Sequence, residues 1–179
     1  MENIMENIER VLITKEELQK KAQELGQAIT NDYQNKQPLL IGVLKGCVVF
    51  FSDLIRNINL DCEIDFMALS SYGRSSVSSG EVKVIKDLST SIQDRHIIIV
   101  EDIVDSGITL NYLINLLKLR GAKSVEICTL MDKPERRQRE VYPKYKGFVI
   151  PNEFVVGYGL DYAEIYRNLP EVCVLKLPE

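Results

Sequence analysis

The chain has 179 residues, of which 45% are hydrophobic and 27% charged, and its formal net charge is -4. This length and balance predict one globular domain with a well-buried core and exclude a largely disordered chain, which would be poorer in Ile, Val and Leu. The apolar runs fall far short of the about 18 residues that cross a bilayer, and an acidic chain with a pI near 5.2 lacks the basic excess typical of nucleic-acid binding.

Helices and buried strands alternate along the chain. A capping box at residues 14–17 predicts the start of a helix, and apolar residues follow at spacings of three and four from Leu18 to Ile29. Residues 39–44 are continuously apolar, as expected of a strand buried on both faces. We expect further strands at 64–69, 82–85, 97–100, 125–131 and 154–156, and helices at 47–55 and 110–119. Alternating strands and helices predict an α/β fold around a largely parallel sheet.

The polar, acidic start of the chain has no positive segment followed by an apolar one, so we expect no secretory signal and a protein that stays in the cytosol. His96 is the only histidine, and no two cysteines form a CxxC pair, which favours buried, reduced thiols over a zinc site. The cysteines are Cys47, Cys62, Cys128 and Cys173.

Residues 70–81 differ from the rest because they are rich in Ser and Gly and poor in side chains that could be buried. We expect a mobile loop there. Its composition fits two alternatives, a plain surface hairpin connection or a lid that closes over a reacting centre.

Residues 97–110, IIIVEDIVDSGITL, are the most informative segment. An apolar strand ends in the carboxylates of Glu101 and Asp102, a short polar loop follows, and an amphipathic helix begins at once. At such a junction, unpaired N–H groups and the helix dipole suit a phosphate, to which Ser106 and Thr109 add hydroxyl donors. The sequence therefore predicts a monophosphate site beside two acids that suit ribose hydroxyls, directly or through a metal ion.

Each part of this segment also has an ordinary structural explanation. Asp105 or Ser106 can cap a helix, and Glu101 and Asp102 can be solvated charges at a strand end. The chain contains no GxxxxGKS/T motif and no GxGxxG after a strand, so an ATPase or a dinucleotide enzyme is disfavoured.

Residues 100–109, VEDIVDSGIT, resemble the 5-phosphoribosyl-1-pyrophosphate-binding motif of the type I phosphoribosyltransferases. LKG at 44–46, SSYG at 70–73 and FVVGYGLDY at 154–162 are similar to the hypoxanthine-guanine branch of that family, in the same order. The resemblance implies the family's largely parallel sheet flanked by helices, with a small hood over the base built from the N-terminal and C-terminal segments of a single domain, residues 1–179. It also implies Mg²⁺-dependent transfer of the phosphoribosyl group to hypoxanthine or guanine, giving IMP or GMP.

This resemblance assigns the reacting groups around the ribose. Asp105 is expected near N7 of the purine, where it acts on the proton, a task that suits a carboxylate. Glu101 and Asp102 would hold the ribose hydroxyls, and residues 105–109 would bind the 5′-phosphate. The remaining members of this loop are Ser106, Gly107, Ile108 and Thr109. Some relatives carry a basic or polar residue in place of Ile108, so phosphate affinity is expected to depend more on backbone donors here.

The resemblance also assigns the leaving group and the metal. Leu44, Lys45 and Gly46 correspond to the pyrophosphate loop, in which the first peptide bond can be cis, and Arg167 is a further pyrophosphate contact. The resemblance implies that Asp161, Glu101 and Asp102 bind Mg²⁺. Read without the resemblance, Lys45 and Gly46 are an ordinary strand-ending turn and Arg167 is a solvated surface charge.

The remaining assignments concern the base. Lys133 would donate a hydrogen bond to the 6-oxo group, which distinguishes hypoxanthine and guanine from adenine. Phe154 would stack on the purine, the backbone of Val155 would meet its edge, and Asp161 is expected as a further purine-binding residue. A core Phe in a strand is the alternative for Phe154. Ser71 and Tyr72 correspond to the tip of the lid.

Two other functions fit parts of the sequence. A phosphoribosyltransferase-fold regulator could bind RNA or DNA through the basic run KPERRQR, residues 133–139, although such a run is usually a solvated face. A transferase for adenine or a pyrimidine is disfavoured by Lys133 and by residues 154–162. We therefore expect 5-phosphoribosyl-1-pyrophosphate and 6-oxopurines as partners, neither nucleic acid nor membrane, and a homodimer or homotetramer; acceptance of xanthine stays open.

Overall fold

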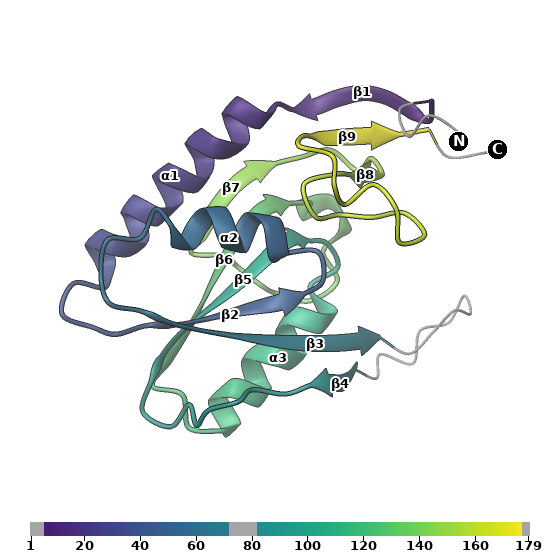
Figure 1. The fold of residues 1–179 in the computed structure, drawn as a ribbon. Coiled ribbons are helices and arrows are strands. Elements are labelled where there is room, and N and C mark those ends of the chain that lie inside the picture. Colours follow the sequence, from purple (N-terminus) through teal and green to yellow (C-terminus); the bar gives the residue numbers. More distant parts are fainter. Residues whose placement is uncertain (1–5, 72–81, 177–179) are drawn as a thin grey trace.

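The structure, a computed structural model, describes residues 6–71 and 82–176, whose strands form two sheets (Figure 1). The larger sheet has six strands in the order β4-β3-β2-β5-β6-β7, and the smaller has three in the order β1-β9-β8. The helices of the described residues are α1 (Lys15–Asp32), α2 (Val48–Ile55), α3 (Ile108–Leu119) and the short 3₁₀ helix η1 (Pro134–Arg136). The strands are β1 (Ile8–Ile13), β2 (Leu39–Leu44), β3 (Glu63–Ser71), β4 (Val82–Lys86), β5 (His96–Val104), β6 (Ser124–Asp132), β7 (Tyr145–Val149), β8 (Val155–Val156) and β9 (Val172–Leu175).

Most of the six-stranded sheet is parallel. Strand β2 pairs in parallel with β3 and β5, and β6 pairs in parallel with β5 and β7. Strand β4 runs antiparallel to β3 at the edge. Helices α2 and α3 provide the crossovers from β2 to β3 and from β5 to β6, as parallel neighbours require. The predicted α/β fold around a largely parallel sheet is confirmed.

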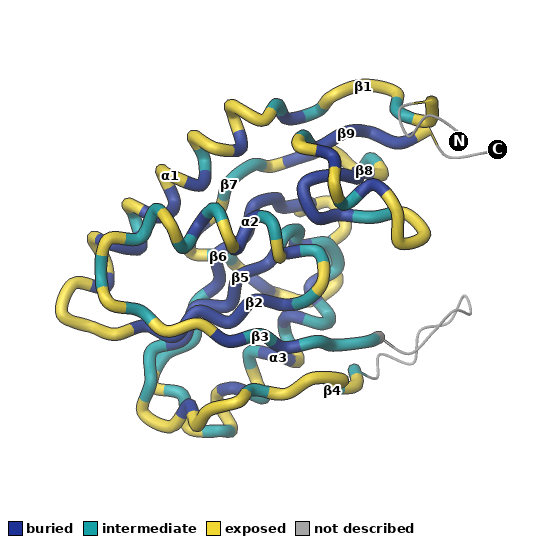
Figure 2. Tube along the Cα trace, in the orientation of Figure 1, coloured by how far each residue is buried: buried dark blue, intermediate teal, exposed yellow. Residues whose placement is uncertain are grey.

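Helices α1 and α2 cover one face of the large sheet, and α3 covers the other (Figure 1). Strand β5 lies between these layers: Ile98 and Val100 pack on the side of α1 and α2, whereas Ile97 and Ile99 pack on the side of α3. All four side chains are fully buried, and the central strands are dark in Figure 2. Burial on both faces is the reason that the predicted central strands are continuous apolar runs.

Helix α1 begins at the predicted capping box. The Thr14 hydroxyl accepts a hydrogen bond from the Glu17 N–H at 3.3 Å, and the Glu17 carboxylate accepts one from the Thr14 N–H at 2.9 Å. The predicted apolar stripe from Leu18 to Ile29 is buried, and the opposite side of the helix is exposed (Figure 2). No helix in the two described ranges is long and apolar enough to cross a membrane.

The sequence prediction misses β1, β7 and β9. Strand β1 carries mostly exposed side chains, and its residue Ile8 pairs with Leu175 at the other end of the chain. Strand β9 is fully buried but has only four residues, fewer than a periodic pattern needs. Strands of this kind form because tertiary packing stabilises them, so local sequence gives little sign of them.

Several predicted boundaries shift near the functional segments. Strand β5 continues to Val104 instead of ending at Val100, because its backbone ladder with β6 includes the pair Glu101 and Thr129. Helix α3 begins at Ile108, two residues before the prediction. Strand β8 begins at Val155, so Phe154 lies outside it.

The predicted lid falls almost wholly on residues that the structure does not describe. Ser71 is the last residue of β3, and β4 begins at Val82, so the segment joins two antiparallel neighbours. Tyr72 and the rest of 72–81 lie outside the described residues.

Candidate active site

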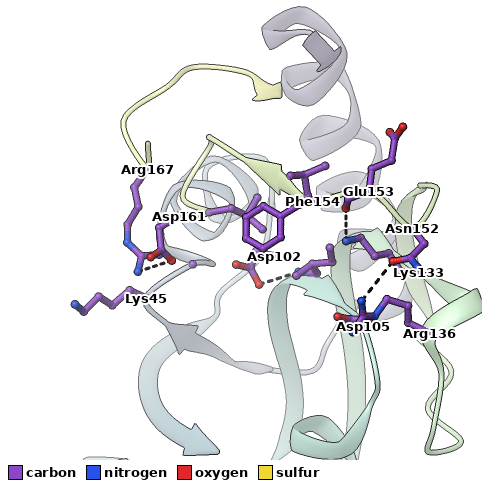
Figure 3. Close-up of a pocket in the computed structure, with 14 residues that line it drawn as sticks. Lys45, Asp102, Asp105, Lys133, Arg136, Asn152, Glu153, Phe154, Asp161 and Arg167 are labelled. Atoms are coloured by element: carbon purple, nitrogen blue, oxygen red, sulfur yellow. Dashed lines mark hydrogen bonds and ion pairs between the residues drawn. The ribbon is translucent and has the colours of Figure 1, made fainter. Parts of the chain in front are cut away.

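A cleft of about 600 Å³ lies between the large sheet and the small one (Figure 3). One wall is formed where β2, β5 and β6 end, and the other by β8 and the connection from β8 to β9. Because the carboxyl ends of parallel strands meet at one edge of a sheet, Lys45, Asp105 and Lys133 face the same cavity despite their separation in sequence.

The two cavities at this edge contain most of the residues expected at the site. The 600 Å³ cleft is lined by Lys45, Gly46, Asp102, Asp105, Lys133, Phe154, Val155, Asp161 and Arg167. A second cavity, of about 190 Å³, is lined by Glu101, Asp105, Ser106, Gly107 and Thr109. Asp105 lines both, so the cavities are neighbours. Leu44 and Ile108 line neither.

Glu101 and Asp102 point to different cavities, as successive residues of a strand do. Glu101 is 8% exposed, so the alternative of a solvated charge at a strand end is wrong for this residue. Burial, together with the neighbouring Asp102 carboxylate, raises the pKa of Glu101 well above its usual value. Burial also raises the pKa of Asp102 to about 6, although its Oδ1 accepts a hydrogen bond from the Ile103 N–H at 2.8 Å. Both acids of the pair are thus held in surroundings that disfavour their charged forms.

Gly46 lies directly against Asp102. A Cβ atom at this position would be 1.7 Å from Asp102 Oδ2, and one at Gly159 would be 2.1 Å from the Gly46 carbonyl oxygen. The peptide bond that precedes Lys45 is cis. Two glycines thus let the 44–46 loop, the acid pair and the β8–β9 connection approach more closely than side chains would permit.

The smaller cavity lies at the N-terminus of α3. Gly107, the N-cap residue, has a left-handed backbone with φ of 78°, and a Cβ there would meet the Arg139 carbonyl oxygen at 2.9 Å. Among the described residues, no side chain forms an N-cap hydrogen bond to this helix. The Ile108 N–H donates a long hydrogen bond, of 3.4 Å, to Ser106 Oγ. The alternative of Asp105 or Ser106 as N-cap residue is therefore wrong. The first N–H groups of the helix and the positive end of its dipole are oriented for an anion.

The backbone of the segment after η1 forms hydrogen bonds to the loop that precedes α3. The Ser106 carbonyl oxygen accepts hydrogen bonds from the Gln138 and Arg139 N–H groups at 2.8 and 3.1 Å. The Arg137 guanidinium donates to the Asp105 carbonyl oxygen at 2.6 Å and to the Asp132 carboxylate. Arg137 thus points into the protein, and the basic run 133–139 does not form one continuous cationic face.

The Asp105 carboxylate is half-exposed at the junction of the two cavities. Arg136 Nε lies 2.8 Å from its Oδ1 but is not aligned as a donor, and this oxygen is both shielded from solvent and without a hydrogen-bond partner among the described residues. Arg136 Nη1 reaches the Asn152 side-chain oxygen at 3.5 Å (Figure 3). A shielded acceptor without a donor is costly, so this carboxylate is suited to a ligand that supplies a proton.

Sequence reasoning missed Arg136, Asn152 and Glu153, all of which line the cleft. Arg136 carried a signal, because it belongs to the basic run next to Lys133, but that run was attributed to solvent or to nucleic acid. Asn152 and Glu153 carried none beyond their position before the FVVGYGLDY segment.

Lys133 follows β6 and is 8% exposed. Its Nζ donates a hydrogen bond to the Glu153 carbonyl oxygen at 2.6 Å, which fixes the side chain across the cleft (Figure 3). Burial lowers the pKa of this amine, and the nearby Asp105 carboxylate opposes that effect. An ammonium has three donors, so two remain for a ligand.

Phe154 forms an apolar part of the cleft wall. The ring is 41% exposed and meets Tyr162 edge to face, with centroids 5.6 Å apart. The alternative of a core Phe in a strand is therefore wrong. The next residue, Val155, is buried and pairs with Val174 of β9, which anchors this wall to the small sheet.

Arg167 and Lys45 lie at the other end of the cleft (Figure 3). Arg167 Nη2 is 2.8 Å from Asp161 Oδ1, and its Nη1 donates to the Gly159 carbonyl oxygen at 2.9 Å. Its Nε is shielded from solvent and has no partner among the described residues. With a side chain only 25% exposed, Arg167 is not the solvated surface charge of the alternative interpretation.

The described residues contain no group of three His, Cys, Asp or Glu side chains gathered as metal ligands. Asp102 and Asp161 nevertheless both present carboxylate oxygens to the cleft. Such a pair fits Mg²⁺, which is usually bound by one or two carboxylates together with substrate phosphates and water.

Comparison with known proteins identifies the family of this chain. The family profile of the phosphoribosyl transferase domain matches residues 9–163. Over 170 residues the chain is 58% identical to the hypoxanthine-guanine phosphoribosyltransferase of Bacillus subtilis (strain 168), covering 95% of this chain and 94% of that protein. It is 54% identical over 175 residues to the bifunctional protein TilS/HprT of Listeria monocytogenes serotype 4b (strain F2365), covering 98% of this chain, and it spans 27% of the length of that relative.

The fold has a close counterpart among solved structures. A crystal structure of a hypoxanthine phosphoribosyltransferase from Staphylococcus aureus superposes with a TM-score of 0.94 at 48% sequence identity, covering 98% of this chain and 96% of that one. The match includes both sheets, because it spans nearly every residue of the chain. The chain therefore belongs to the hypoxanthine-guanine phosphoribosyltransferases, within the phosphoribosyl transferase domain family.

Proposed function

We propose that this chain transfers the 5-phosphoribosyl group from 5-phosphoribosyl-1-pyrophosphate to N9 of hypoxanthine or guanine, giving IMP or GMP and pyrophosphate in purine salvage. One observation carries the proposal: Asp105 lines both the cavity at the N-terminus of α3, which also contains Glu101, and the cleft that contains Asp102 and Lys133. The 58% identity to a hypoxanthine-guanine phosphoribosyltransferase over most of both chains supports the same reaction.

The ribose 5′-phosphate would bind in the 190 Å³ cavity, held by the first N–H groups of α3 and the Ser106 and Thr109 hydroxyls. Ile108 adds no polar group, so backbone donors carry most of this contact. Glu101 and Asp102 would hold the ribose hydroxyls, and Asp102 is the acceptor that faces the cleft.

The purine would bind between Phe154 and the end of β5. The exposed ring of Phe154 gains apolar contact by stacking on a base. Lys133, fixed by the Glu153 carbonyl oxygen, has two donors left for a 6-oxo group, and the amino group of adenine would not accept them. The backbone of Val155 would contact the base edge. Asp105 would accept the N7 proton as N9 forms its bond to C1 of the ribose.

Pyrophosphate would leave toward the 44–46 loop and Arg167. The transition state resembles an oxocarbenium ion, and N9 attacks on the face opposite the departing group, so C1 is inverted. When bound, Mg²⁺ neutralises charge on the diphosphate and makes it a better leaving group. Asp102 and Asp161, which line the same cleft, are the residues that would hold it, together with substrate oxygens, whereas Glu101 faces the neighbouring cavity.

The small sheet would act as the hood over the base, since β8 contributes the wall that contains Phe154 and Val155. We further propose that the reaction takes place in the cytoplasm, because none of the cysteines is paired and three of them are buried. We expect a homodimer or homotetramer, and a monomer by light scattering at working concentration would contradict this.

The experiment is nucleotide formation by the purified protein with 5-phosphoribosyl-1-pyrophosphate, Mg²⁺ and, in separate reactions, hypoxanthine, guanine, xanthine, adenine or uracil. Formation of IMP and GMP that stops on chelation of Mg²⁺ is expected, and the xanthine reaction tests tolerance at the 2-position. Absence of product with every base would favour the alternative of a regulator that binds nucleic acid. The structure gives little support to that alternative, because Arg137 and Lys133 of the basic run point into the protein.

A further inference from the structure

The connection between β8 and β9 contains a short loop in an unusual backbone conformation. Ala163, Glu164 and Tyr166 have positive φ angles of 51°, 68° and 78°, a region that side chains other than glycine rarely adopt. Two interactions hold the loop: the Glu164 N–H donates to Asp161 Oδ2 at 2.9 Å, and Tyr162 and Ile165 exchange backbone hydrogen bonds of 3.1 Å. Strain of this kind persists only where the surroundings over-determine it, and it is concentrated at functional sites.

This backbone carries the Glu164 carboxylate to the two cations at the end of the cleft. Its Oε2 lies 2.9 Å from Lys45 Nζ and 3.5 Å from Arg167 Nη2. Lys45 follows β2 and Arg167 follows the strained loop, so a single carboxylate oxygen bridges the two walls. Both cations line the cleft, and both are the groups to which the proposed function assigns the leaving pyrophosphate.

We infer that the Glu164 carboxylate is an internal competitor of pyrophosphate: it pairs with Lys45 and Arg167 when the diphosphate is absent and is displaced when the diphosphate binds. This inference rests on the proposed function. It assigns Glu164 a role in setting the affinity for pyrophosphate and its rate of release.

Charge and exposure support an exchange of partners. Asp161 already pairs with Arg167 at 2.8 Å, so Glu164 is not needed to neutralise that side chain, and its contact with Lys45 is the shorter of its two. The Glu164 and Lys45 side chains are each 66% exposed, so neither is held by packing and each can move without opening a core. A diphosphate carries more negative charge than one carboxylate and can contact both cations at once, so it can replace Glu164.

Displacement weakens the binding of pyrophosphate, because the ion pairs of Glu164 are lost as those of the ligand form. Each exposed ion pair changes an equilibrium by a factor of about five at most. Removing the charge of Glu164 should therefore tighten pyrophosphate binding about 3- to 10-fold. If product release limits turnover, as in many enzymes, the same change lowers kcat and lowers KM for 5-phosphoribosyl-1-pyrophosphate.

The test compares Glu164→Gln with the unmodified protein in titration calorimetry with inorganic pyrophosphate and Mg²⁺, and in product inhibition by pyrophosphate. Glu164→Gln should show a lower Kd and a lower inhibition constant, by about 3- to 10-fold. Glu164→Asp, which keeps the charge, should stay closer to the unmodified protein. Glu24→Gln is the matched control, because it removes an exposed carboxylate that pairs with Lys21 at 2.5 Å on α1, away from the cleft.

The possible outcomes separate this inference from the proposed function. If the unmodified protein binds neither pyrophosphate nor substrate, the proposed function fails. If it binds pyrophosphate and turns over but Glu164→Gln binds pyrophosphate equally well or more weakly, the internal competitor is refuted. An equal gain in affinity in Glu24→Gln would also refute it, since the effect would then come from net charge alone.

Discussion

The two parts of the site, the 190 Å³ cavity that we propose as the phosphate end and the 600 Å³ cleft that we propose as the base end, are built differently. At the phosphate end, the contacts come from the backbone at the start of α3, from Gly107 and from the buried Glu101, and Arg137 and the 138–139 backbone hold the loop by hydrogen bonds. At the base end, the charged groups are side chains that already have partners within the protein, such as Lys133 with the Glu153 carbonyl oxygen and Lys45 with Glu164. The first arrangement suits a group that stays bound through the reaction. The second suits groups that arrive and leave.

The largest expected effect is at Asp105, where the two ends meet. Asp105→Ala should lower kcat about 10²- to 10⁴-fold, because it removes the proposed acid-base group without a steric clash. Circular dichroism and the thermal midpoint should remain close to those of the unmodified protein. Binding of a nucleoside monophosphate should change only a few-fold if the phosphate end is a backbone site. A folded variant with nearly full turnover would show that Asp105 has no acid-base role.

Asp102, which faces the base end, should reduce the stability of the folded protein as pH rises. The folded pKa of Asp102 is about 6, above the value of about 3.9 for an unfolded chain, so the folded state holds its proton longer and loses relative stability between these two pH values. Above pH 6 the cost reaches at most about 3 kcal/mol. Asp102→Asn should therefore be more stable than the unmodified protein at pH 8 in urea unfolding without ligand, although less active.

This advantage of Asp102→Asn should shrink as pH falls from 6 toward 4, because the Asp102 carboxyl is then protonated in the folded protein. A stability difference that is the same at pH 4.5 and pH 8 would mean that Asp102 is solvated and that the acid pair is not a strained part of the site.

At the base end, Lys133→Met keeps much of the apolar volume and removes the ammonium. We expect kcat/KM for hypoxanthine to fall about 10- to 100-fold, since a hydrogen bond to a charged group contributes about 1.5 to 3 kcal/mol. Affinity for inorganic phosphate at the other end should not change. Equal losses for both ligands would indicate that Lys133 supports the whole cleft and does not select the base.

The smallest expected effects are in the loop before α3, where two substitutions compare the contributions of the backbone and of a side chain to phosphate affinity. Gly107→Ala introduces a Cβ 2.9 Å from the Arg139 carbonyl oxygen at a φ of 78°, and we expect about 1 to 3 kcal/mol of lost stability with weaker phosphate binding. Ser106→Ala removes only a hydroxyl whose hydrogen bond to Ile108 is 3.4 Å long, so phosphate affinity should change less than about threefold. The reverse order would contradict a backbone anion site.

Local sequence patterns were sufficient to predict an element where its structure depends only on residues that are neighbours in sequence. The capping box at Thr14, the doubly buried runs of β2 and β5 and the polar loop before α3 each consist of neighbouring residues, so their sequence alone indicates what they form. The acid pair could be located in this way, but its burial could not, because Glu101 lies in a strand that continues for three more residues.

The sequence by itself determined the α/β class, the polar loop before α3 and the types of residue to which we assign the proposed reaction, because periodicity and motif spacing are local properties. Only the tertiary structure decided that β1 pairs with β9 at the other end of the chain, that Arg136 lies beside Asp105, and that Glu164 reaches Lys45 across 119 positions. Such pairs depend on the way that crossovers and the small sheet bring distant segments together. No local propensity encodes that arrangement, since it results from burying both faces of one sheet at once.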